Sequence, residues 1–115
     1  MDELDDLRLR LRAFASDREW EVFHSPKNLA MALAAEGGEL LEVFQWMTEA
    51  QSRALAPGAQ SAAAEEMADV LLYLVRLADE LGIDLIDAAN RKLAKNAEKY
   101  PVDKARGNSR KSTEL

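Results

Sequence analysis

Two acidic pairs with the same spacing are the part of the sequence best suited to do chemistry. Glu36 and Glu39 form one pair, and Glu66 and Asp69 form the other. Residues three apart share one face of a helix, so each pair can act on a common ligand. Four oxygen donors without a neighbouring histidine or cysteine favour a hard cation, Mg²⁺ or Mn²⁺, over Zn²⁺. Magnesium held by carboxylates usually completes its coordination with water and substrate phosphates, so the pattern favours a phosphorylated substrate.

The first pair falls on a helix predicted over residues 26 to about 47. At about 100° per residue, Glu36 lies in the middle of the apolar stripe of this helix and Glu39 lies at its edge. A carboxylate on an apolar face is costly to bury unless it is paired or binds a metal. Gly37 and Gly38 each cost roughly 1 kcal/mol relative to alanine inside a helix, which favours a close approach of another group to the backbone here.

The second pair falls on a helix predicted over residues 61 to 82. Apolar residues cover more than half of its circumference, which indicates packing on most sides. The remaining narrow strip carries Glu66, Asp69 and Tyr73. If the two helices pack antiparallel, all four carboxylates can converge. The alternative is that both pairs are solvated surface charges, because this spacing is common on helices.

Two further helices complete a chain that we predict to be all-α. They span residues 2 to about 18 and 84 to about 99, and an extra helical turn is expected around residues 52–56. Ser25 and Asp84 are the predicted N-caps of the helices that they precede, and Gly82 is a predicted C-cap. No segment alternates apolar and polar residues with the period of two that a half-buried strand requires.

Composition and charge exclude several classes of function. The chain has 115 residues, is 48% hydrophobic, carries a net charge of −6 and contains no cysteine. It lacks the basic footprint that binding to nucleic acid or to a membrane surface needs, and no apolar run approaches the roughly 20 residues of a membrane span. We expect a cytoplasmic protein with one domain over residues 1–101 and a basic, flexible tail over residues 102–115.

Several segments together resemble a known family. They are residues 36–46 (EGGELLEVFQW) and 65–73 (EEMADVLLY), with echoes in residues 20–29, 92–101 and 109–115. The sequence resembles the MazG-type all-α nucleoside triphosphate pyrophosphohydrolases, and more narrowly their dCTP pyrophosphatase branch. One departure is Ala35, where many relatives carry an additional glutamate. This replacement could change the outer coordination shell of the metal or the number of metal ions, but it leaves the four main ligands intact.

The resemblance implies hydrolysis of a (deoxy)nucleoside triphosphate to the monophosphate and pyrophosphate, with dCTP or modified cytosine nucleotides as the preferred substrates. It implies Mg²⁺, with Mn²⁺ as the alternative, held by residues matching Glu36, Glu39, Glu66 and Asp69. Glu39 and Glu36 are the expected catalytic residues, with Glu39 orienting the attacking water. The implied architecture is a four-helix MazG-like bundle that assembles as a dimer or tetramer, with its sites at the subunit interfaces.

The resemblance also implies a set of substrate-binding residues. Those expected near the base are Trp20, His24, Asn28, Trp46, Tyr73, Asn96 and Tyr100, and those expected near the phosphates are Lys92, Arg110 and Lys111. Ordinary packing remains an alternative for both tryptophans, as does a surface position for His24. Two other functions stay open: the same chemistry on another substrate, such as a phosphoribosyl-nucleotide, and a non-catalytic helical interaction module.

Overall fold

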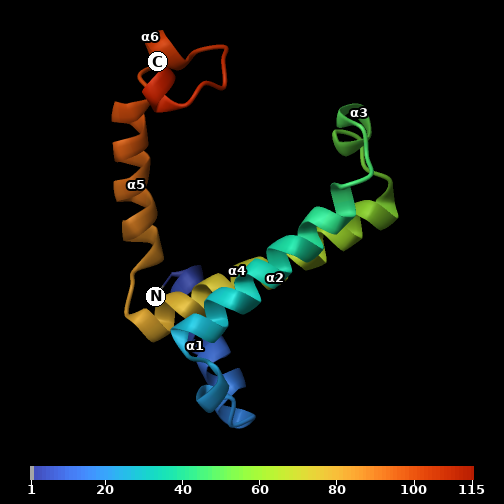
Figure 1. The fold of residues 1–115 in the computed structure, drawn as a ribbon. Helices are drawn as coiled ribbons and strands as arrows, with labels where there is room; N and C mark the ends of the chain where they lie inside the picture. Colours follow the sequence, from blue (N-terminus) through green and yellow to red (C-terminus); the bar gives the residue numbers. More distant parts are fainter. Residues whose placement is uncertain (1) are drawn as a thin grey trace. The chain divides into compact units, whose positions relative to one another are not determined.

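The computed structural model describes residues 2–115, and all regular structure in that range is helical, which confirms the predicted all-α class (Figure 1). In chain order the elements are α1 (Glu3–Asp17), the 3₁₀ turn η1 (Glu21–Phe23), α2 (Pro26–Phe44), α3 (Glu49–Ser52), α4 (Pro57–Leu81), α5 (Leu85–Lys99), α6 (Val102–Ala105) and the 3₁₀ turn η2 (Ser112–Glu114). No helix in this range combines the length and apolar character that crossing a bilayer would require.

The chain divides into two compact units, one ending at Gly82 and the other beginning at Ile83. The first unit contains α1 to α4, and the second contains α5, α6 and η2. The segment predicted as a flexible tail carries α6 and η2. Its flexibility, and the predicted domain boundary at residue 101, stay predictions.

Side-chain caps fix where three of the longer helices begin. Asp2 accepts a hydrogen bond from the backbone N–H of Asp5 at 2.7 Å and so caps α1. Ser25 and Asp84 do the same for α2 and α5, at 3.2 and 3.0 Å from the N–H groups three residues on, which confirms both predicted caps. Gly82 ends α4 in the left-handed conformation at φ 64°, as predicted, because glycine adopts that conformation without a steric penalty.

Three predicted boundaries are wrong. Helix α4 begins at Pro57 instead of near residue 61, because proline at the first helical position has a suitable φ and gives up no hydrogen bond there. Helix α2 ends at Phe44 instead of near residue 47. The extra helical turn lies at Glu49–Ser52, earlier than predicted, because Thr48 and Gln51 form a reciprocal capping box.

The core of the first unit lies where α4 packs against α2 along much of its length and against α1 near its C-terminal end (Figure 1). The buried apolar residues come from these three helices, and Leu29 and Val75 are the largest fully buried side chains. The others are alanines. Alanine lets helix backbones approach closely, so the pairing of α2 with α4 can bring side chains from both helices into one site.

The expected close approach at Gly37 and Gly38 is not made by the described part of the chain. A Cβ atom at either position would have no heavy atom of another segment within 4 Å. The described residues therefore leave this face of α2 open, and the close approach of another group stays a prediction.

Candidate active site

Helices α2 and α4 bring three of the predicted ligands together. One carboxylate oxygen from each of Glu36, Glu39 and Glu66 lies within 4.8 Å of the others. Glu36 and Glu66 are half-buried, and Glu39 is exposed. The packing of the two helices therefore produces the convergence that the sequence spacing allowed.

Two oxygens of this cluster have no hydrogen-bond partner among residues 2–115. They are Oε2 of Glu36 and Oε2 of Glu66, and both are shielded from solvent. No ion pair formed within residues 2–115 involves either residue. A buried carboxylate oxygen without a donor or a cation is costly, so this site has the properties of one that binds a positive ligand.

The proximity of the acids changes their protonation. Hydrogen bonding with Glu39, burial and the neighbouring negative charges raise the pKa of Glu36 to about 7. The pKa of Glu66 is also raised, mainly by burial and then by Glu39. A bound divalent cation would reverse this effect by favouring the charged carboxylates. The donor set and the partnerless oxygens fit such an ion.

Asp69 lies one turn further along α4 and is half-buried. It is not a member of the converging group of three, although its charge contributes to the raised pKa of both Glu36 and Glu66. Asp69 also lines a neighbouring cavity. It therefore stands between the acidic cluster and the cavity, and its role as a metal ligand stays a prediction.

The cavity has a volume of about 240 Å³ and lies between α1, the segment before α2, and α4. Its lining includes three predicted substrate-binding residues: Trp20, His24 and Tyr73. The Trp20 ring stands edge-on to Phe14, with centroids 5.8 Å apart, and edge-on to His24 at 6.2 Å. Aromatic walls with a few polar groups are typical of sites for small planar ligands.

Among the lining residues that the sequence reasoning missed, Phe14 and Arg76 stand out. Phe14 belongs to the apolar stripe of α1 and gave no signal distinct from a core residue, yet 47% of it is exposed. Arg76 is a charged residue within the wide apolar arc of α4, which is a signal that could have found it. Only 5% of Arg76 is exposed.

Two other predicted residues of the first unit lie outside the cavity lining. Trp46 follows the end of α2, is 89% exposed and does not line the cavity that Trp20 lines. The side-chain amide of Asn28 donates to the backbone carbonyl of Phe23 at 3.2 Å and thereby fixes the turn that leads into α2. Contact of either residue with a substrate stays a prediction.

The remaining predicted residues belong to the second unit, which is described by itself. Lys92 is exposed on α5, and Asn96 is half-buried one turn later. The backbone N–H of Tyr100 donates to the carbonyl of Asn96 at 2.9 Å at the end of α5. Arg110 donates its backbone N–H to the side chain of Asn108, and Lys111 is exposed. Roles for these five residues in substrate binding stay predictions.

Comparison of the sequence with known families identifies the class of protein to which this pair of helices, with its acidic cluster and aromatic cavity, belongs. The sequence model of the MazG-like family matches residues 31–115, and the chain belongs to this family. This confirms the resemblance noted in the sequence.

Individual proteins of known name are similar to this chain over most of its length. The chain is 45% identical over 114 residues to dCTP pyrophosphatase 1 of Homo sapiens, covering 97% of this chain and 67% of the human protein. It is 42% identical over 114 residues to dCTP pyrophosphatase 1 of Bos taurus, covering 97% and 68%. The crystal structure of a pyrophosphatase from Archaeoglobus fulgidus is similar, with a TM-score of 0.82, 39% identity, and coverage of 88% of this chain and 94% of that one.

Proposed function

We propose that this protein hydrolyses (deoxy)nucleoside triphosphates to the monophosphate and pyrophosphate, with dCTP or a modified cytosine nucleotide as the preferred substrate. The role would be sanitation of the nucleotide pool, in the cytoplasm. The observation that carries the proposal is the acidic cluster, with its two partnerless carboxylate oxygens, and the neighbouring aromatic cavity that Asp69 also lines. The relatives named dCTP pyrophosphatase 1 support the choice of substrate.

The acidic cluster is the proposed magnesium site. Glu36, Glu39 and Glu66 would hold the cation, with Asp69 as a fourth ligand, and Mn²⁺ could replace Mg²⁺. When bound, the cation supplies neutralisation of the triphosphate and of the departing pyrophosphate. Glu39 is the exposed member of the cluster and is our candidate for orienting the attacking water, with Glu36 as its partner. Without a bound cation, the negative charges of the cluster would repel the triphosphate.

The cavity is the proposed base site. Trp20 and Tyr73 provide aromatic surfaces, and stacking of a base on such a ring contributes about 1–3 kcal/mol. Asp69 and His24 provide the polar contacts of the same cavity. Asn28, Trp46, Asn96 and Tyr100 are proposed to contact the base from elsewhere in the assembly, and Lys92, Arg110 and Lys111 to contact phosphates.

An exposed apolar stripe on α4 supports self-association. Met67, Leu71, Leu74 and Leu81 are 59%, 43%, 37% and 50% exposed and follow one another at spacings that share a helix face. Exposed apolar side chains gathered on one helix face are typical of an interaction surface. A second copy of the chain is the proposed occupant, in a homodimer or homotetramer, and a symmetric assembly would allow one pocket to draw residues from two subunits.

Release of pyrophosphate from a panel of dNTPs, NTPs and a phosphoribosyl-nucleotide tests the proposal, with Mg²⁺ and with EDTA. We expect metal-dependent turnover that is fastest on dCTP, and its loss in Glu36→Gln. The matched control is Glu42→Gln, which neutralises an exposed carboxylate on the same helix, outside the cluster. Turnover restricted to a phosphoribosyl-nucleotide would change the substrate assignment. A folded, metal-supplied protein that hydrolyses none of these would overturn the proposal in favour of an interaction module.

A further inference from the structure

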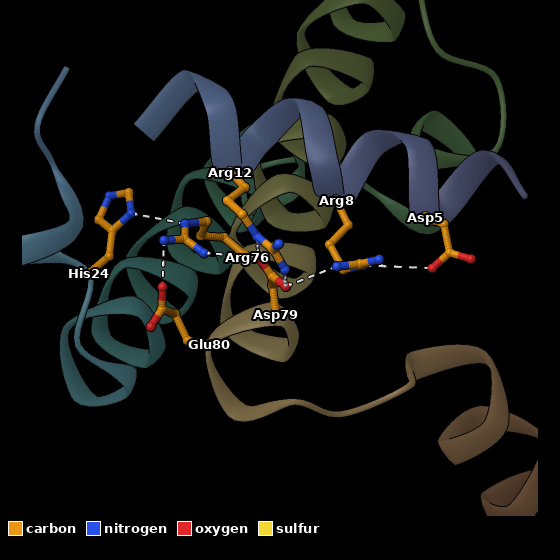
Figure 2. Close-up of polar contacts among 7 residues, drawn as sticks. All are labelled: Asp5, Arg8, Arg12, His24, Arg76, Asp79 and Glu80. Atoms are coloured by element: carbon orange, nitrogen blue, oxygen red, sulfur yellow. Dashed lines mark hydrogen bonds and ion pairs between the residues drawn. The ribbon is translucent and has the colours of Figure 1, made fainter. Parts of the chain in front are cut away.

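A buried arginine connects the cavity to a network of charges that the proposed chemistry does not use. Arg76 of α4 is 5% exposed and donates hydrogen bonds with all three guanidinium nitrogens (Figure 2). Its Nε donates to Nδ1 of His24 at 3.2 Å, its Nη1 donates to Asp79 at 3.2 Å, and its Nη2 donates to Glu80. The planar guanidinium is therefore held on three sides.

Asp79 anchors this network to α1. Its carboxylate accepts two hydrogen bonds from Arg12, at 2.6 and 3.0 Å, and one from Arg8 at 3.2 Å, in addition to the one from Arg76 (Figure 2). Its side chain is 6% exposed. The hydrogen bonds with Arg12 lower the pKa of Asp79 despite its burial. The carboxylate stays charged at neutral pH, so the orientation of Arg76 is fixed by groups on two helices.

The contact with Arg76 determines which nitrogen of His24 carries the proton. A guanidinium N–H is always a donor, so Nδ1 must offer its lone pair. In a neutral imidazole the proton then resides on Nε2. Burial, followed by the charge of Arg76, lowers the pKa of His24, while the charges of Glu80 and Glu21 act in the opposite direction with smaller effect. His24 is thus neutral at physiological pH.

We propose that Arg76 is a positioning residue that fixes His24 as the Nε2–H tautomer, so that the base site presents a donor at His24 beside the carboxylate acceptor of Asp69. Both residues line the cavity, and with Nδ1 occupied, Nε2 is the ring nitrogen left for a ligand. Cytosine offers an amino donor together with the N3 and O2 acceptors, which suits this pair. Thymine and uracil carry O4 in place of the cytosine amino group and an N3–H donor in place of the N3 acceptor. In the same orientation, the carboxylate of Asp69 would face O4, and two acceptors would meet. This inference rests on the proposed function of the cavity.

The tautomer can be measured without any activity. His24 is the only histidine of the chain, so the imidazole ¹⁵N correlation spectrum reports this ring alone. We expect a single Nε2–H form in the whole unliganded protein near pH 7.5. Arg76→Lys keeps the charge but removes the Nε–H donor, and should give a mixture of the two tautomers. The matched control is Arg12→Lys, which alters the same network without touching His24 and should leave the single form.

Nucleotide discrimination is the second readout. In Arg76→Lys we expect KM for dCTP to rise on the order of 10-fold with little change in kcat, and the preference for dCTP over dTTP to fall by a similar factor, as for loss of one hydrogen bond. Should this variant fail to fold, a mixed or Nδ1–H tautomer in the parent protein would still overturn the inference.

A mixed or Nδ1–H tautomer in an active parent protein would overturn the inference and leave the proposed function intact. An unchanged tautomer and an unchanged dCTP preference in a folded Arg76→Lys protein would also overturn it. A parent ring fixed as Nε2–H that becomes mixed in Arg76→Lys supports the positioning role of Arg76. If that result came from a protein that hydrolyses no nucleotide, the proposed function alone would be refuted.

Discussion

Replacing Glu36 by glutamine is the perturbation that most directly tests the acidic cluster. In the structure the Oε2 atom of Glu36 is buried without a partner, and hydrogen bonding with Glu39 helps to raise the pKa of Glu36 to about 7. Glutamine has nearly the same shape but no charge. Its amide can donate to a neighbouring carboxylate, so the variant should be more stable than the parent protein in the absence of metal.

The sign of the pH dependence follows from this raised pKa. The unfolded chain loses the Glu36 proton near the ordinary value of 4.5, whereas the folded chain keeps it until about pH 7. The folded state therefore binds more protons across this window, and the contribution of Glu36 to stability is fully present below pH 4.5 and is lost as the pH rises to about 7. The Glu36→Gln variant has no carboxylate to ionise at this position and does not lose stability in this way. The difference between its free energy of unfolding and that of the parent protein should therefore grow from pH 4.5 to 7 and be largest at pH 8.

Metal should reverse the order of stability. A cation at 100 times its Kd stabilises the folded state by about 2.7 kcal/mol, which for a chain of this length corresponds to a Tm increase of roughly 10 °C. If the variant binds the metal about 100-fold more weakly, the same concentration contributes only about 0.4 kcal/mol. Magnesium should therefore raise the Tm of the parent protein well above that of Glu36→Gln.

Thermal unfolding followed by circular dichroism, at pH 5 and pH 8 with EDTA or with Mg²⁺, measures both effects. Glu42→Gln controls for the loss of one negative charge on the same helix, because Glu42 is exposed and lies outside the cluster. Two results would refute the reasoning: a metal-free Glu36→Gln protein less stable than the parent at pH 8, or an equal Mg²⁺-dependent increase in both proteins.

Three further substitutions test the core, the charge network and the cavity. Leu29→Ala should cost 2–5 kcal/mol in urea unfolding, because the side chain is 1% exposed; a cost below 1 kcal/mol would contradict its place in the core. Asp79→Asn should cost about 3 kcal/mol at pH 7, since it leaves three arginines without their shared carboxylate. Because the pKa of Asp79 is lowered, the difference from the parent protein should shrink as the pH falls through and below its ordinary value of 3.8, and a constant difference would argue against an electrostatic origin. Trp20→Ala should raise KM for dCTP roughly 10- to 100-fold in steady-state pyrophosphate release, by loss of one stacking surface, and an unchanged KM would place the base elsewhere.

The helical class and most element boundaries were predictable because they depend on local chemistry. Caps at Ser25 and Asp84 and the glycine stop at Gly82 each act within one helical turn, and the structure has all three. The start of α4 was not predicted, since Pro57 and Gly58 are equally typical of a loop and of a first helical turn.

The sequence alone determined which residues could form the acidic site. An acid in the middle of an apolar helix stripe, repeated with the same spacing on a second helix, is a local pattern that needs no coordinates. The family resemblance added the expected base-binding residues, and the structure places Trp20, His24 and Tyr73 around one cavity.

Only the tertiary structure decided how these residues relate to one another. Glu36 and Glu66 are 30 positions apart, and their carboxylates meet because α2 packs on α4. Arg76 is 52 positions from His24, and their hydrogen bond depends on where the turn before α2 crosses α4. No periodicity within one helix encodes such contacts, because the burial of apolar faces sets the register between helices. That register then determines which charges share a buried site and which nitrogen of His24 can carry the proton.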